Sequence, residues 1–131
     1  MTGGLTLSEP ADRRKYYRLD TRWPVTIILN SVTVEGETTS ISAQGVSITC
    51  DESLLLGVST SFDETLLLNE ICTLHIRPPD YYSIKVSGKV VWTDMHGIDG
   101  ENKTVGIGVY IVEISDKDRV YFKDILSAPA G

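Results

Sequence analysis

Apolar and β-branched side chains recur in short stretches of this chain, and most of these stretches predict β-strands. Residues 25–29 are β-branched and apolar, whereas residues 46–50 and 71–76 alternate apolar with polar side chains, as half-buried strands do. Residues 82–92 predict one long strand in which Gly88 marks a bulge. The pattern therefore favours a protein built mainly from short strands.

The C-terminal part of the chain predicts one more strand and then a helix. The strand covers residues 105–112, whose two glycines indicate sharp curvature or a backbone lying close to another group. Ser115 and Asp118 have the spacing of a helix N-cap, and apolar residues at i, i+4 spacing follow between residues 121 and 126. Several strands followed by one helix predict an all-β-dominated fold, a small antiparallel β-barrel with a C-terminal α-helix.

One segment does not fit the strand pattern. Residues 51–70 carry five acidic side chains and no Lys or Arg, and we expect them to form an acidic loop region. After the next strand, Pro78 and Pro79 interrupt the backbone hydrogen bonding that a sheet requires.

Composition narrows the class of protein. The chain has 131 residues, enough for one domain with a real core, and a formal net charge of -6, which excludes a general nucleic-acid binder. No apolar run approaches the roughly 18 residues of a membrane span, and residues 1–11 lack the pattern of a secretory signal. Cys50 and Cys72 are expected to be buried, reduced thiols. These features together predict a cytoplasmic protein.

A cluster of cations near the N-terminus stands out in this acidic chain. Residues 13–18 read Arg-Arg-Lys-Tyr-Tyr-Arg and hold four positive charges. A guanidinium forms paired hydrogen bonds with phosphate oxygens or with the O6/N7 edge of guanine, and its plane stacks on rings. Arg13, Arg14 and Arg18 are therefore candidates for holding an anion that carries flat bases. Charge alone favours a solvated basic patch, which would contribute little to binding or stability.

A second candidate segment offers hydroxyls and a glycine. On a strand, Ser40 and Ser42 would face the same side, and Gly45 can adopt a positive φ in a turn. Such a turn presents hydroxyl and backbone N–H groups to an anion. Taken alone, the segment is more typical of an ordinary hairpin turn.

The two segments together resemble the PilZ family. Its two motifs, Arg-x-x-x-Arg and Asp/Asn-x-Ser-x-x-Gly, correspond to Arg14 and Arg18 and then to Ser40, Ser42 and Gly45. The resemblance continues through the strands and helix and covers about residues 13–126. It implies three parts, which are a flexible N-terminal arm (1–12), a PilZ-like barrel domain (13–126) and a tail (127–131).

The resemblance implies a function. PilZ domains bind the bacterial second messenger cyclic di-GMP, so Arg13, Arg14 and Arg18 would clasp guanine edges and phosphates, while Ser42 and Gly45 would contact one guanine and its phosphate. Binding would order the arginine arm and pass the signal to an unidentified partner protein. The resemblance implies no catalytic residue and no cofactor, and we expect a monomer or weak homodimer.

The match departs from the family at Ser40, where Asp or Asn is usual. A serine offers one shorter contact, and losing an ordinary hydrogen bond costs about 0.5–1.5 kcal/mol. We therefore expect weakened rather than abolished binding, and Thr38 or Thr39 are candidates to compensate. The same departure keeps a second hypothesis open, a PilZ-like protein-interaction adaptor that binds cyclic di-GMP weakly or not at all.

The remaining reactive residues suggest no chemistry. His75 and His96 lack neighbours at metal-ligand spacing, and no order of Ser, His and Asp or of Cys and His suggests an enzyme. Trp23 and Trp92 are expected in the core or at the barrel rim rather than as stacking platforms. A barrel that binds oligonucleotides would need a basic groove, which the overall acidity disfavours.

Overall fold

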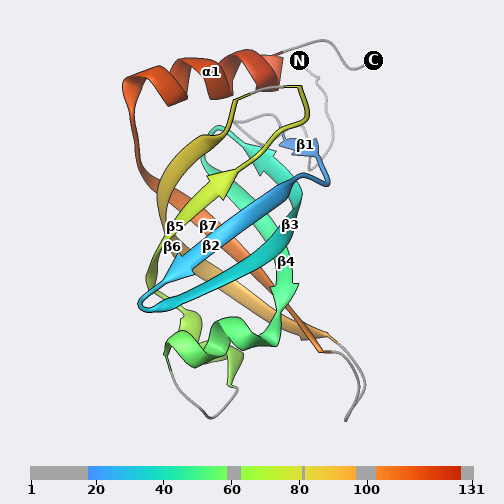
Figure 1. Ribbon diagram of the computed structural model, residues 1–131, viewed down its shortest axis with the longest axis vertical. Coiled ribbons are helices and arrows are strands. Elements are labelled where there is room, and N and C mark those ends of the chain that lie inside the picture. Colours follow the sequence, from blue (N-terminus) through green and yellow to red (C-terminus); the bar gives the residue numbers. More distant parts are fainter. Residues whose placement is uncertain (1–17, 59–62, 81, 97–102, 128–131) are drawn as a thin grey trace, which may run out of the picture.

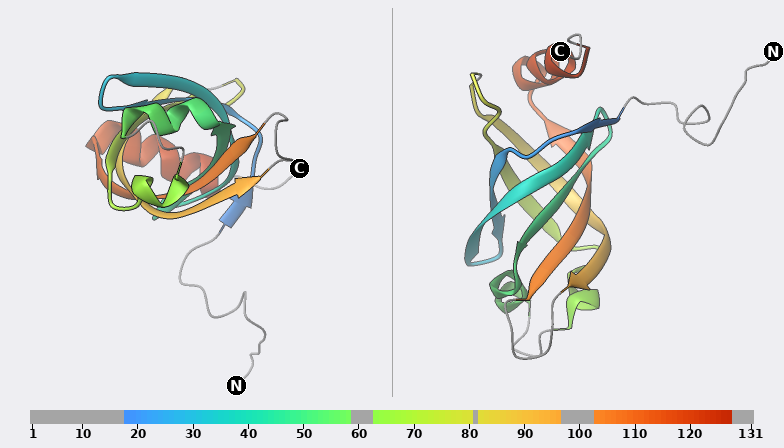
Figure 2. Two further views of the ribbon diagram at one scale, coloured as in Figure 1. Left: turned by 90° about the horizontal axis from the view of Figure 1, so that it is seen from below. Right: turned by 90° about the vertical axis from the view of Figure 1, so that its right-hand side faces the viewer.

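The strands form one antiparallel sheet that closes on itself. The computed structural model describes residues 18–58, 63–80, 82–96 and 103–127. Its strands are β1 (Arg18–Asp20), β2 (Pro24–Leu29), β3 (Val32–Ser42), β4 (Gly45–Asp51), β5 (Ile71–Ile76), β6 (Ile84–His96) and β7 (Thr104–Ile114). The order β1-β3-β2-β5-β6-β7-β4 closes because β4 also pairs with β3 (Figures 1 and 2). The predicted small antiparallel barrel is confirmed.

β1 lies outside the closed ring. It pairs with the end of β3, while β2 pairs with the earlier part of β3 along the same edge. The two strands therefore follow each other along β3, and among the described strands β1 pairs with β3 alone.

The barrel interior is filled by the alternate residues of each strand. In β2, Val25, Ile27 and Leu29 are fully buried, and every other barrel strand contributes in the same way. Cys50 and Cys72 are part of this interior and are free thiols. Burial raises the pKa of Cys50 to about 12 and that of Cys72 to about 11. Both thiols therefore stay protonated at neutral pH.

Short helices close the end of the barrel opposite α1 (Figure 2). They are η2 (Glu52–Gly57) and η3 (Glu64–Leu67), both 3-10 helices. Their leucines Leu54, Leu55 and Leu67 are fully buried. The sequence prediction of a plain loop over residues 51–70 was wrong, because these leucines fill the open end of the barrel.

The C-terminal helix α1 (Asp116–Ser127) lies across the other end of the barrel (Figure 1). As predicted, the Ser115 hydroxyl caps it and accepts a hydrogen bond from the Asp118 backbone N–H at 3.1 Å. Phe122 and Ile125 face the barrel and are buried. The Asp118 carboxylate also accepts from the Lys85 backbone N–H at 3.2 Å, which ties the first turn of α1 to β6.

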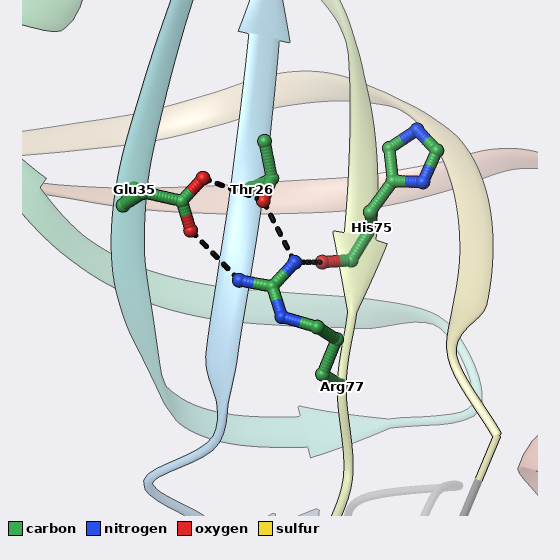
Figure 3. Close-up of polar contacts among 4 residues, drawn as sticks. All are labelled: Thr26, Glu35, His75 and Arg77. Atoms are coloured by element: carbon green, nitrogen blue, oxygen red, sulfur yellow. Dashed lines mark hydrogen bonds and ion pairs between the residues drawn. The ribbon is translucent and has the colours of Figure 1, made fainter.

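A polar cluster joins three strands on the outer surface (Figure 3). Arg77 follows β5 and donates to Glu35 on β3 and to Thr26 on β2, each at 2.7 Å. Thr26 donates in turn to the second oxygen of Glu35 at 2.8 Å. The hydrogen bond from Thr26, together with the Arg77 guanidinium, lowers the pKa of Glu35. This cluster links β3, β2 and β5 independently of their backbone ladder.

Among the described residues, no helix has both the length and the apolar character needed to cross a membrane.

Candidate functional site

A bulge in β3 determines which way its serines point. The pairing of β3 with β4 shifts between Thr38 and Ser40, so Thr39 is an extra residue. Before the bulge, Thr38 pairs with buried Ile48, and after it Ile41 pairs with buried Val46. The side chains of residues 40 and 42 therefore lie on the outer face of the barrel, as the sequence prediction of a shared face required.

The β3–β4 hairpin is shaped by Ser42. Its hydroxyl accepts hydrogen bonds from the backbone N–H groups of Gln44 and Gly45, at 3.3 and 3.2 Å. Gly45 does not adopt the positive φ that the sequence suggested. It is required for space instead, because a Cβ there would lie 2.7 Å from the Val109 carbonyl oxygen of β7.

β1 places two charged side chains beside these serines. Arg18 pairs with Ser42 and Asp20 pairs with Ser40, so all four lie on the outer face, whereas Leu19 pairs with buried Ile41. Facing cross-strand residues have Cβ atoms about 4.5–5.5 Å apart. Arg18, the second arginine of the first motif, is thereby brought beside the second motif.

Thr38, which precedes the bulge, anchors the chain that follows β1. Its hydroxyl is fully buried, lies 2.7 Å from the Thr21 hydroxyl and accepts the Trp23 backbone N–H at 2.9 Å. The Thr21 N–H also donates to the Thr39 carbonyl at 3.1 Å. These bonds hold β1 in register with the end of β3.

A second bulge turns Trp92 outward. Val90 of β6 pairs with buried Val109, but the register then shifts and Trp92 pairs with Gly108. The indole lies directly over Gly108, since a Cβ built there would be 1.9 Å from Trp92 Nε1. Trp92 is 44% exposed. It was expected in the core or at the rim and instead forms part of the outer surface beside Ser47, which also pairs with Gly108.

These features enclose a shallow hollow of about 240 Å³. It is lined by Arg18, Ser42, Gln44, Gly45, Val46, Ser47, Val91, Trp92, Gly108, Val109 and Tyr110. A second hollow of about 480 Å³ follows along the same face, with Asp20, Thr21, Arg22, Glu37, Thr38, Thr39 and Thr49 at its walls. The two adjoin, since Arg18 and Asp20 are alternate residues of β1 and Ser47 and Thr49 are alternate residues of β4.

Three of the predicted site residues, Arg18, Ser42 and Gly45, meet at the first hollow. Ser40 lies on the same face, but it is only 7% exposed and is packed between Asp20 of β1 and Ser47 of β4. Arg13 and Arg14 lie outside the described residues. The sequence prediction missed Trp92 and Tyr110 as lining residues.

The hollow combines groups suited to binding rather than to bond breaking. It offers one guanidinium, serine hydroxyls, and the exposed faces of Trp92 and Tyr110. Among the described residues, no three His, Cys, Asp or Glu side chains gather in a way that would hold a metal ion. A flat, anionic molecule would find a cation for its charge and an aromatic plane for its rings.

One protein-family model matches most of this chain. The family model described as PilZ domain matches residues 12–128. A search of the curated proteins finds no match.

Several solved structures share the fold. The PilZ domain with c-di-GMP of YcgR from Escherichia coli superposes with a TM-score of 0.61 at 12% identity, covering 87% of this chain and 88% of that one. The Bacillus subtilis inhibitor of motility MotI/DgrA gives 0.61 at 20% identity, and Borreliella burgdorferi PlzA in complex with c-di-GMP gives 0.57 at 11%. These two are covered over 49% and 55% of their lengths, against 87% and 91% of this chain. The chain thus spans about half of each of them.

Proposed function

Because the chain belongs to the PilZ domain family, we propose that it binds cyclic di-GMP at the hollow between Arg18 and Trp92. The observation that carries the proposal is the β1–β3 register, which brings Arg18 of the first motif opposite Ser42 of the second. In this arrangement the guanidinium pairs with a phosphate or a guanine edge. A guanine ring stacks on the Trp92 indole, and the hairpin at Gly45 supplies the floor.

The arginines that precede β1 complete the proposed clasp. Arg13 and Arg14 are close to Arg18 in the chain, so they can reach the same ligand from the side that β1 leaves open. We propose that ligand binding orders this segment across the barrel and that a partner protein recognises the result. Hydrogen exchange of residues 13–17 would then slow on addition of cyclic di-GMP.

Titration calorimetry with cyclic di-GMP tests the proposal. Bound ligand also stabilises the native state, by about 2.7 kcal/mol at a concentration of 100 times Kd, so the melting temperature should rise with ligand concentration. Absence of both heat and a melting shift at near-millimolar ligand would reject binding and favour the adaptor hypothesis. In that case protein partners would be captured equally with and without the nucleotide.

The Arg18→Ala substitution locates the site. Loss of one bidentate contact to a guanine or phosphate should weaken binding by about 1–3 kcal/mol, which is one to two decades in Kd. Lys85→Ala is the control for charge, because Lys85 is exposed on β6 and lines neither hollow. Equal losses in both variants would mean that general charge, and not this site, controls binding.

A further inference from the structure

The outer face carries a row of five cross-strand partners that crosses both hollows. Register places Asp20 opposite Ser40, Ser40 opposite Ser47, Ser47 opposite Gly108 and Gly108 opposite Trp92. The three central residues are small, so the row forms a floor with a carboxylate at one end and an indole at the other. At about 4.8 Å per strand, the two ends lie about 19 Å apart along the curved surface.

We propose that Asp20 is the acceptor that reads the guanine base farther from Trp92. A guanine presents two neighbouring donors, N1–H and the 2-amino group, on its Watson–Crick edge. A carboxylate accepts both at once through its two oxygens. The inference rests on the proposed function, since it concerns how the same ligand is recognised.

Two other hydroxyls on this part of the surface, those of Thr38 and Ser40, are unsuited. The Thr38 hydroxyl is fully buried and already holds Thr21 and Trp23. Ser40 is 7% exposed and has a single hydroxyl. Thr38 therefore does not compensate for the serine at position 40 in the way the sequence suggested.

Asp20 is both accessible and uncommitted. Its side chain is exposed at the wall of the second hollow, and within the described part of the chain it forms no hydrogen bond or ion pair. Because Asp20 faces Ser40 across the β1–β3 pair, its Cβ lies about 4.5–5.5 Å from that of Ser40 on the same face of the barrel. The acceptor is thus provided by the neighbouring strand.

The direction of the change in Kd on removing the Asp20 charge distinguishes a contact with guanine from no contact. Cyclic di-GMP carries two negative phosphates, so removing an acidic side chain that makes no contact should leave binding unchanged or tighten it. Removing a carboxylate that accepts from guanine should weaken it. We expect Asp20→Asn to raise Kd for cyclic di-GMP roughly 10-fold, because the amide keeps one acceptor oxygen but presents a donor in place of the second.

Glu37→Gln is the matched control. Glu37 lines the same hollow and also lies on the outer face, where it pairs with Thr49, but its carboxylate is near Arg22. The substitution removes the same charge and should leave Kd unchanged or lower it. Thermal melting of both variants without ligand should match the parent chain.

A ligand analogue separates base reading from other effects. Cyclic di-inosine lacks the 2-amino group, so the parent chain should bind it more weakly than cyclic di-GMP, and Asp20→Asn should reduce that preference. If the parent chain binds cyclic di-GMP but Asp20→Asn keeps the same Kd and preference, or Glu37→Gln loses as much, the role of Asp20 is refuted. If the parent chain binds neither nucleotide, the proposed function itself fails.

Discussion

Single residues decide which side chains reach the surface of the proposed binding site. Serine and arginine at the motif positions were identified from the sequence, and the structure places Arg18, Ser42 and Gly45 around one hollow. Trp92 was not predicted at this surface, because strict alternation of side chains along β6 from buried Val90 would point residue 92 into the barrel. The unpaired residue Val91 reverses that alternation, and nothing in the local sequence marks the reversal.

Gly108 controls the position of the Trp92 indole. In Gly108→Ala the added Cβ would meet the indole at 1.9 Å, so the half-exposed ring must swing away from the hollow. Loss of stacking should then weaken cyclic di-GMP binding by about 1–3 kcal/mol. Titration calorimetry measures the loss, and tryptophan fluorescence reports the movement of the ring.

The control for Gly108→Ala is Trp92→Phe, which keeps an aromatic face without crowding Gly108. It should bind more tightly than Gly108→Ala. An unchanged Kd in Gly108→Ala would show that the indole takes no part in binding.

At the scale of the element, bulges and caps matter more than strand propensity. Most strands and the capped helix α1 were predicted from periodicity. A bulge at Gly88 of β6 was also predicted; the register does shift between Ser87 and Gly88, but the extra residue is Val112 of β7. The bulge at Thr39 was not predictable, because it depends on Thr38 bonding to residues 21 and 23.

The cluster of Thr26, Glu35 and Arg77 predicts an acid-dependent effect on stability. The pKa of Glu35 is lowered in the folded protein, so its ionised form stabilises the fold above its unfolded pKa of about 4.3. This contribution is lost as the pH falls through the folded pKa. Glu35→Gln should therefore lower the urea midpoint at pH 7 and have little effect near pH 3.

Glu37→Gln is a suitable reference for that experiment. Glu37 has only the 4.0 Å ion pair with Arg22, and both side chains are largely exposed. Its substitution should change the midpoint less at pH 7. A Glu35→Gln difference that persists unchanged at pH 3 would contradict the electrostatic account.

At the scale of the whole molecule, closure of the sheet was foreseen, but the way its ends are closed was not. Strands followed by one helix predict a barrel with a helix over it. The short helices η2 and η3 could not be inferred from periodicity, because each is too short to show a repeating apolar pattern. They nevertheless bury Leu54, Leu55 and Leu67. The reason for these leucines appears only in the folded barrel, where they fill its open end.

The closed interior predicts inert thiols. Cys50 and Cys72 are buried and have pKa values of about 12 and 11, so neither should react with Ellman's reagent at pH 8 until the barrel unfolds. Both should react at once in guanidinium chloride. Rapid labelling of the native protein would mean that the barrel opens frequently, and Cys50→Ala and Cys72→Ala would identify the thiol concerned.

The same thiols should make the folded state less stable at alkaline pH. In the unfolded chain they ionise near pH 8.5, whereas in the fold they remain protonated to about pH 11. The free energy of unfolding should therefore decrease as the pH rises through this interval.

The edge position of β1 has a consequence for how the affinity can evolve. β1 is three residues long and pairs only with β3, so it can detach while the ring stays closed. If only a fraction of molecules has β1 seated, the apparent Kd is the intrinsic Kd divided by that fraction. If the proposed function holds, substitutions at the Thr21–Thr38 contact would then change the apparent Kd for cyclic di-GMP without altering a residue of the first hollow.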